Sequence, residues 1–361
     1  MKFRYLAAFL FSLLFCFSLT FSFGKRNKKK TEPAVTEELV SLEQEEELAD
    51  FDENGDFSYK HELPDGEPLE FREVWGYVVS GREGEFRPDM PITDLVYFSA
   101  DVNCYGEFDS IPKASVFKDF KGRKHLSVTC QSRSLTHFVL DPQYGVVNKM
   151  IATLTAAAKD YDGINIDFEL IPKRDVKNFR DFVRKLRRSL GEVQWLTIAV
   201  PARTRTLEND AFDYAALAPY VDRVFIMAYD EHWSTSQPGA IANTDWGKRI
   251  AEYAMSVLPQ KKLVMGLPFY GRTWQDESFG QAWYFSGVNR IMGENKVRHV
   301  ERDEGVPHFT FKKQIQVTGY FEDTYSAVTK CRAYKELGCE RIGFWRIGQE
   351  DPSFWDWIKI K

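Results

Sequence analysis

Short apolar runs recur along the chain from Phe71 onward, and turn-forming or polar residues separate them. Many of these runs hold consecutive β-branched or aromatic residues, which is typical of strands covered on both faces. Longer segments with helical periodicity lie between several of the runs. The expected strands are Val74–Val79, Asp94–Ala100, Lys124–Thr129, Gly163–Glu169, Leu196–Pro201, Arg223–Tyr229, Leu263–Phe269 and Arg341–Ile347, and the expected helices are Val146–Lys159, Val176–Leu190, Lys248–Val257 and Tyr325–Leu337.

Eight strands that alternate with helices predict an α/β fold, a (β/α)8 TIM barrel. A doubly wound sheet is the alternative, but it would need a Gly-rich phosphate loop after an early strand, and the sequence shows none. The interval between Tyr270 and Tyr325 is too long for a simple crossover and contains two short strand-like runs. We therefore expect a small β-rich insertion at about residues 273–322, in the loop after the seventh strand.

The first 24 residues have the pattern of a targeting segment. Lys2 and Arg4 precede an apolar run that ends at Phe23, and Gly24 and a basic cluster follow. This pattern predicts a signal peptide at residues 1–24 and an exported protein, in the periplasm, at the cell surface or outside the cell. An uncleaved anchor is the alternative, because the run is about long enough to span a bilayer.

Residues 25–70 are acidic and poor in aromatic residues, which predicts a low-complexity linker before a domain at residues 71–361. The amino-terminal segment permits association with the envelope, and we expect a monomer. The net charge of -5 argues against nucleic acid as the main partner. No cysteine or histidine spacing indicates a metal or cofactor. Buried free thiols are favoured over a disulfide framework for the four cysteines after the signal, Cys104, Cys130, Cys331 and Cys339.

The stretch Asp162–Glu169, with the sequence DGINIDFE, is the strongest chemical signal. Its polar and apolar residues alternate, so Asn165, Asp167 and Glu169 lie on one face of the predicted strand. At about 3.3 Å per residue, the backbones of Asp167 and Glu169 are about 6.6 Å apart. Two acids this close on an apolar strand disfavour each other's ionisation, and such a cost usually indicates catalysis.

Other polar and aromatic side chains fall near the carboxyl ends of predicted strands, where barrel active sites lie. An acidic pocket with aromatic walls suits a sugar better than a phosphate. Trp233, Trp246 and Trp274 lie on or near loops, where stacking and structural roles both stay open. The basic cluster at residues 184–188 is interpreted as a solvated helix face. The residues at the carboxyl ends of predicted strands are Asn165, Asp167 and Glu169 on the fourth strand, Tyr229 and Asp230 on the sixth, Trp345 on the eighth and Tyr77 on the first.

Four motifs, in order, resemble glycoside hydrolase family 18, the chitinase-like enzymes. DGINIDFE resembles the family's DGxDxDxE signature, and Met227–Asp230 resembles its MxYD. Gly266–Arg272 resembles its seventh strand and Gly343–Trp345 its last, Trp-bearing strand. Asn165 and the sequence MAYDEHW are similar to the bacterial branch that includes spore-cortex lytic N-acetylglucosaminidases.

The resemblance implies a substrate-assisted retaining mechanism. Glu169 would be the general acid and then the base, and Asp167 would orient the acetamido group of the sugar. Tyr229 would donate to the acetamido oxygen, and Trp345 would floor the sugar subsite. The candidate catalytic residues that the resemblance implies are therefore Asn165, Asp167, Glu169 and Tyr229, and the candidate substrate-binding residues are Tyr77, Met227, Asp230, Tyr270 and Trp345. The implied function is a secreted glycosidase that cuts β-1,4 linkages of N-acetylglucosamine-containing glycans, peptidoglycan or chitin-like. A silent glycan-binding protein is the alternative, although such relatives generally lose the proton donor, which is present here as Glu169.

Two departures from the family pattern affect these expectations. Asn165 stands where the family usually has Asp, and an amide cannot share a proton with Asp167. Asn165 can still hydrogen-bond Asp167 and hold it toward Glu169, so we expect an active enzyme with a changed pH profile. The segment Ser127–Ser132 replaces the family's SxGG-like third strand, so the subsite there cannot be carried over.

Overall fold

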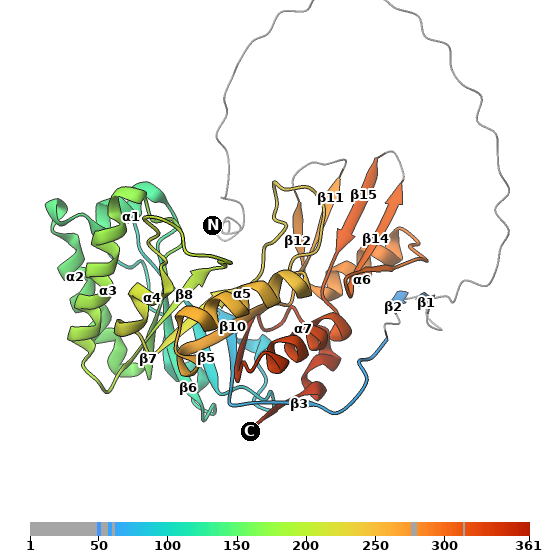
Figure 1. Ribbon diagram of the computed structural model, residues 1–361, viewed down its shortest axis with the longest axis horizontal. Helices are drawn as coiled ribbons and strands as arrows, with labels where there is room; N and C mark the ends of the chain where they lie inside the picture. Colours follow the sequence, from blue (N-terminus) through green and yellow to red (C-terminus); the bar gives the residue numbers. More distant parts are fainter. Residues whose placement is uncertain (1–48, 52–56, 60–61, 276–279, 313–314) are drawn as a thin grey trace, which may run out of the picture. The chain divides into compact units, whose positions relative to one another are not determined.

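The computed structural model describes residues 49–51, 57–59, 62–275, 280–312 and 315–361. Eight parallel strands form a closed barrel, which confirms the predicted TIM-barrel fold (Figure 1). Each barrel strand pairs with the next along the chain, and the last pairs with the first. The strands are β4 (Glu73–Val79), β5 (Asp94–Asp101), β6 (Arg123–Thr129), β7 (Gly163–Asp167), β8 (Trp195–Pro201), β9 (Arg223–Met227), β10 (Leu263–Pro268) and β16 (Arg341–Trp345).

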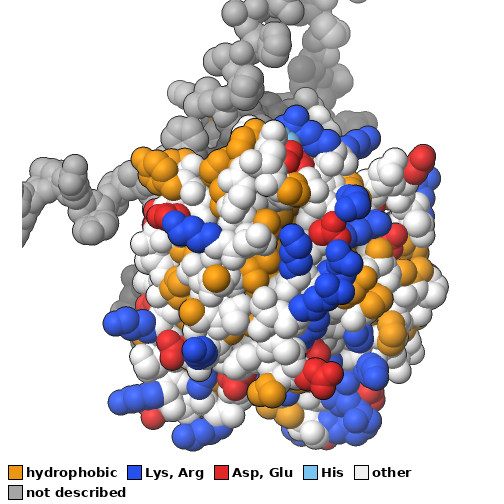
Figure 2. Space-filling model, turned by 90° about the vertical axis from the view of Figure 1, so that its left-hand side faces the viewer, with side chains coloured by type: hydrophobic (Ala, Val, Ile, Leu, Met, Phe, Trp, Pro, Cys, Tyr) orange, Lys and Arg blue, Asp and Glu red, His pale blue; other side chains and the backbone are white. Residues whose placement is uncertain are grey.

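α-Helices follow the barrel strands from β6 to β10, whereas β4, β5 and β16 are followed by short 3-10 segments at Glu83–Glu85, Ala114–Phe117 and Pro352–Trp357. Three helices, α1, α4 and α6, were not predicted from the sequence. Figure 2 shows the face of the molecule that carries α1, α2 and α3. The helices are α1 (Arg133–Leu140), α2 (Val146–Ala157), α3 (Val176–Leu190), α4 (Tyr214–Leu217), α5 (Thr244–Val257), α6 (Phe285–Glu294) and α7 (Thr324–Glu336).

Large side chains fill the barrel interior, so it is a packed core and not an open channel. Trp75, Tyr77 and Phe225 are almost completely buried there and pack with Val96 and Val264. The ring of Phe225 lies directly against Gly343, where any side chain would collide with it. Because these side chains are closely packed, they support the residues at the barrel mouth rigidly.

An ionic network joins the barrel strands at their amino-terminal ends. The Asp94 carboxylate accepts two hydrogen bonds from the Arg123 guanidinium, at 2.6 and 2.7 Å. The Glu73 carboxylate likewise accepts two hydrogen bonds from the Arg223 guanidinium. The centre of the Trp195 ring lies 4.3 Å from the guanidinium carbon of Arg123 and 4.7 Å from that of Arg223. Because this end lies opposite the catalytic face of a TIM barrel, the network serves stability.

A second sheet of five strands occupies the interval between β10 and α7 and is antiparallel throughout (Figure 1). Together with α6 it has its own apolar core, which includes Phe285, Met292, Phe309 and Phe321. Its order is β12-β11-β15-β14-β13, with β11 at Gly271–Gln275, β12 at Gln281–Trp283, β13 at Glu301–Asp303, β14 at Val306–Lys312 and β15 at Gln316–Tyr320.

The segment predicted to be a linker contains three short strands. β1 (Ala49–Phe51) pairs with β2 (Phe57–Tyr59), and β3 (Leu69–Phe71) pairs with the terminal β17 (Ile358–Ile360). The predicted signal peptide and residues 25–48 lie outside the described residues. Among the residues that are described, no helix has the length and apolar character needed to cross a bilayer.

Candidate active site

The candidate carboxylates lie at the carboxyl end of β7. Ile164, Ile166 and Phe168 are fully buried on its outer face, and the Phe168 ring stacks on Phe182 with centroids 5.6 Å apart. This apolar packing fixes the register of the strand, because a slip of one residue would reverse every side chain. Asn165 and Asp167 therefore face the barrel interior. Glu169 lies two residues beyond the strand, which ends at Asp167 and not at Glu169 as predicted.

The Asn165 side chain is held by two other strands. The Tyr77 hydroxyl donates a hydrogen bond to Asn165 Oδ1 at 3.2 Å, and Asn165 Nδ2 donates to Thr197 Oγ1 at 2.9 Å. All three side chains are buried. The expected hydrogen bond between Asn165 and Asp167 does not occur among the described residues; the amide is directed instead to β4 and β8.

Asp167 is buried, with 5% of its surface exposed, and its Oδ1 atom has no hydrogen-bond partner among the described residues. Burial, and then the negative charge of Glu169, raise the pKa of Asp167 well above its usual range. An unpaired buried carboxylate oxygen is costly. A ligand that brings an N–H group to Oδ1 would remove that cost.

Glu169 differs from Asp167 because its side chain is exposed to solvent. The protein that surrounds it at the barrel mouth still removes part of its hydration, and this desolvation, with the negative charge of Asp230, raises the pKa of Glu169. A raised pKa keeps more of the carboxyl protonated near neutral pH, which a general acid requires. The pair therefore combines one buried acid with one that a substrate can reach.

Aromatic side chains from four strands surround these acids. Tyr229, which follows β9, is half-buried, and burial, followed by smaller effects of Tyr77 and Asp167, raises the pKa of its hydroxyl well above the usual value of about 10. The hydroxyl therefore stays protonated and able to donate. The Trp345 ring lies 5.4 Å from Tyr77 and 4.9 Å from Phe98, and Met227 belongs to the same cluster.

Asp230 is anchored by Tyr270, which lies between β10 and β11, and by Arg272 of β11. The Tyr270 hydroxyl donates to Asp230 Oδ1 at 2.6 Å, and Arg272 Nη2 donates to the same atom at 2.8 Å. The Arg272 guanidinium lies 5.4 Å from the centre of the Tyr270 ring. The Asp230 backbone has a φ of +59°, a left-handed conformation that Asp tolerates better than most residues. This carboxylate is therefore held where its charge reaches Glu169.

The structure thus brings the nine predicted site residues to one end of the barrel and adds three that sequence reasoning missed. The additions are Thr197, Phe98 and Arg272. Thr197 is a polar residue inside an apolar strand, and Arg272 ends the seventh-strand motif, so both left a signal in the sequence. Of the tryptophans left open, Trp274 is buried beside Tyr270, Trp246 packs against the main core, and Trp233 is 50% exposed.

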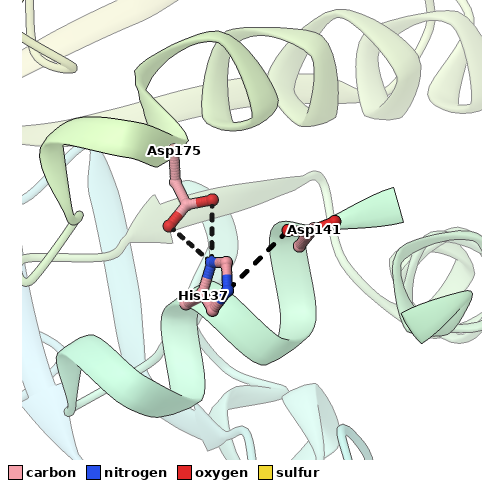
Figure 3. Close-up of side chains that lie close together, drawn as sticks. All are labelled: His137, Asp141 and Asp175. Atoms are coloured by element: carbon pink, nitrogen blue, oxygen red, sulfur yellow. Dashed lines mark hydrogen bonds and ion pairs between the residues drawn. The ribbon is translucent and has the colours of Figure 1, made fainter. Parts of the chain in front are cut away.

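One group of metal-ligating side chains lies among the described residues, on helical segments outside the barrel (Figure 3). His137 Nδ1 is 2.9 and 3.1 Å from the two oxygens of Asp175, and His137 Nε2 is 3.7 Å from Asp141 Oδ2. The two carboxylates face different ring nitrogens, whereas a metal ion would take only one of them. The geometry is that of a histidine that bridges two aspartates and ties α1 to the start of α3.

The sequence model described as glycosyl hydrolases family 18 matches residues 116–350. The chain belongs to this family. The uncharacterized glycosylase YvbX of Bacillus subtilis (strain 168) is 28% identical over 217 residues, which cover 57% of this chain and 63% of that protein. The cortical fragment-lytic enzyme of Bacillus anthracis is 29% identical over 224 residues, which cover 58% of this chain and 52% of that protein.

The chain therefore spans between about half and two thirds of the length of these curated relatives. Among solved structures, the spore cortex-lytic enzyme SleL of Bacillus cereus superposes with a TM-score of 0.72 at 24% identity. The match covers 85% of this chain and 78% of that structure. This likeness concerns the fold, and it agrees with the barrel described above.

Proposed function

We propose that the chain is a glycosidase that hydrolyses β-1,4 linkages beside N-acetylglucosamine, in peptidoglycan or a chitin-like glycan. Membership of the family supports glycoside hydrolysis, and the relative named a cortical fragment-lytic enzyme supports a wall glycan. The observation that carries the proposal is the pair Asp167 and Glu169. One acid is buried with a free oxygen and the other is exposed, and both have a raised pKa at the mouth of the barrel.

In the first step, protonated Glu169 gives its proton to the glycosidic oxygen as the bond from that oxygen to the anomeric carbon breaks. The carbonyl oxygen of the sugar's own acetamido group attacks the anomeric carbon and forms an oxazolinium ring. The unpaired Oδ1 of Asp167 accepts the acetamido N–H. As Glu169 gives up its proton and positive charge develops on the oxazolinium ring, that positive charge favours the ionised form of Asp167, which then balances it. Tyr229, whose hydroxyl stays protonated, donates to the acetamido oxygen and positions it for attack.

In the second step, Glu169 is a carboxylate and accepts a proton from water. The resulting hydroxide equivalent attacks the anomeric carbon and opens the ring, and the acetamido group is restored. Two inversions at the same carbon give retention of configuration. Glu169 ends the cycle protonated, ready for the next linkage.

The decisive experiment compares the parent chain with Glu169→Gln on purified peptidoglycan and on chitooligosaccharides. Because general acid–base catalysis contributes about 10² to 10⁴ in rate, product release should fall by at least about 100-fold. Glu192→Gln, an exposed glutamate just after α3, is the matched control and should keep parental activity. Glycan binding by the parent chain without any product would establish the silent glycan-binding alternative.

We further propose that the protein is exported and associates with the envelope, on the strength of the basic and apolar pattern of residues 1–24. A double substitution of Leu13→Arg and Leu14→Arg interrupts the apolar run. The parent chain should then fractionate outside the cytoplasm and the variant inside it. Identical fractionation of the two chains would refute export by this segment.

A further inference from the structure

A groove runs between α2 and α3 on the outer face of the barrel, away from the catalytic end of β7. It is an open depression of about 350 Å³, and five of its six lining residues are exposed to solvent. Each helix contributes three residues at the spacing i, i+3, i+4, so two facing ridges line it. Small residues at the last position of each ridge leave the space open. The lining residues are Asn148, Ile151 and Ala152 on α2, and Lys185, Arg188 and Ser189 on α3.

The basic residues of α3 fall into two groups. Lys177 and Arg184 both contact Asp181, each at 2.8 Å, and Arg187 contacts Asp222 at 2.8 Å. Lys185 and Arg188 form no ion pair with any described residue. Lys185 and Arg188 are exposed to solvent, as the interpretation of this cluster as a solvated helix face expects. They are also the two basic residues of the cluster that line the groove.

The groove lining carries two positive charges and no negative one. The chain as a whole has a net charge of -5, so this is a local excess of the opposite sign. Figure 2 shows Lys and Arg side chains gathered in a band on the face that carries α2 and α3. Two cations side by side on a concave surface attract an anion, although Lys185 also acts on the Asp181 carboxylate one turn earlier in α3.

The donors in the groove match a phosphate group better than a carboxylate. Arg188 offers a planar fork for two oxygens, and Lys185 offers a point charge with three rotatable donors. Asn148 and Ser189 add a neutral amide and a hydroxyl. A carboxylate has only two oxygens to receive these groups, whereas a phosphate monoester has three. Ile151 and Ala152 form an apolar floor that suits the carbon skeleton of a polyol or sugar.

We propose that the groove between α2 and α3 binds a phosphate monoester of a sugar or polyol, either free or attached to a glycan. None of its residues belongs to the catalytic end of the barrel, so this site is separate from the one proposed to cut the glycosidic bond. Binding here would hold the chain on phosphorylated material independently of turnover.

The test uses the full chain and isothermal titration with glycerol 3-phosphate. Saturable binding in the millimolar range is expected, and the double variant Lys185→Gln/Arg188→Gln should bind at least about tenfold more weakly. The control double variant Lys177→Gln/Arg184→Gln removes the same charge from the same helix, at residues that are already paired, and should bind like the parent. Both variants should keep the parental rate on a chitooligosaccharide, if the parent has one.

Absence of saturable binding to the parent, or equal weakening in the two double variants, would overturn the proposal. A pull-down with a phosphorylated wall glycan, before and after phosphatase treatment, distinguishes a phosphate attached to a glycan from a free phosphate monoester. Retention that disappears with phosphatase and in the groove variant assigns the phosphate to a glycan. Binding of glycerol 3-phosphate without such retention assigns it to a free ester.

Discussion

The Tyr77 hydroxyl donates a hydrogen bond to Asn165 Oδ1 across the barrel interior, at a distance of 3.2 Å. Asn165 uses its amide group at the same time to donate to Thr197. The residue nearest to Asp167 on the strand face is therefore neutral, and its observed side-chain hydrogen bonds go to Tyr77 and Thr197. Asp167 keeps an unpaired buried oxygen, and its ionisation is governed by burial and by Glu169.

The first prediction concerns a carboxyl at position 165. In Asn165→Asp, two carboxyl groups lie in one buried space. Their total negative charge at any pH is larger than that of Asp167 alone in the parent chain, because Asn165 carries no charge. More negative charge near Glu169 raises the pKa of Glu169 further. The basic limb of the pH dependence of kcat/KM should therefore move to higher pH, because the general acid stays protonated longer.

The matched control for this variant is Asp162→Asn. Asp162 lies at the opposite end of the same strand segment, where it accepts a hydrogen bond from the backbone N–H of Lys124. Its pH profile should coincide with that of the parent chain. An unchanged basic limb in Asn165→Asp would mean that position 165 does not influence the acid.

The second prediction assigns a positioning role to Thr197. Thr197→Val keeps the shape of the side chain but leaves a buried N–H of Asn165 without its acceptor, which costs about 1–3 kcal/mol of stability. The freed amide can then turn toward Asp167 and lower its pKa. We expect kcat to fall more than KM changes, and Thr197→Ser, which restores a hydroxyl, to recover kcat. A loss of stability in the Val variant with parental kcat and pH profile would make Thr197 purely structural.

The third prediction is that substitutions of Asp230 and Arg272 shift the pKa of Glu169 in opposite directions. The charge of Asp230 raises the pKa of Glu169, so Asp230→Asn should lower that pKa and move the basic limb of kcat/KM to lower pH. Arg272 donates to Asp230 and offsets its charge, so Arg272→Gln should move the same limb to higher pH. Shifts in the same direction for both variants would show that the effect is not the charge of Asp230.

The barrel strands could be predicted because each carries its own pattern of apolar residues. The pattern does not show where pairing stops: alternation continues to Glu169, but β7 ends at Asp167. As a result the sequence placed Asp167 and Glu169 in equivalent settings, whereas one is buried and the other exposed. α1 was missed because it is only eight residues long, although Ser132 caps it by accepting from the backbone of Leu135.

The motifs located the candidate site, but the partners within it depend on contacts between distant parts of the chain. Tyr77 is 88 residues from Asn165 and Thr197 is 32 residues from it. The expectation that Asn165 bonds Asp167 considered only neighbours on one strand. The same limit applies to α3, where the partner of Arg187 is Asp222, 35 residues away. Which charges are paired becomes visible only once the strands are assembled.

The fourth prediction concerns stability and its dependence on pH. Asp94 is fully buried, and although burial opposes ionisation, its hydrogen bonds with His125 and Arg123 and the positive charge of Arg123 hold the pKa of its carboxyl below the usual value. Removing one partner of such a buried pair costs about 3–5 kcal/mol. Asp94→Asn should lower the free energy of unfolding at pH 7 by this order, measured as the shift in a denaturant unfolding curve.

The sign of the pH effect follows from the lowered pKa. The unfolded chain has an aspartate pKa of about 3.9, so the stabilisation by Asp94 is complete above that pH. As the pH falls below it, the unfolded state takes up the proton first, and the stabilisation is lost as the pH approaches the folded pKa. The parent chain should therefore lose stability below about pH 4 more steeply than Asp94→Asn. Asp119→Asn, at an exposed site, should change stability by less than about 0.5 kcal/mol, and parallel acid curves for the parent and Asp94→Asn would contradict the role given to this carboxylate.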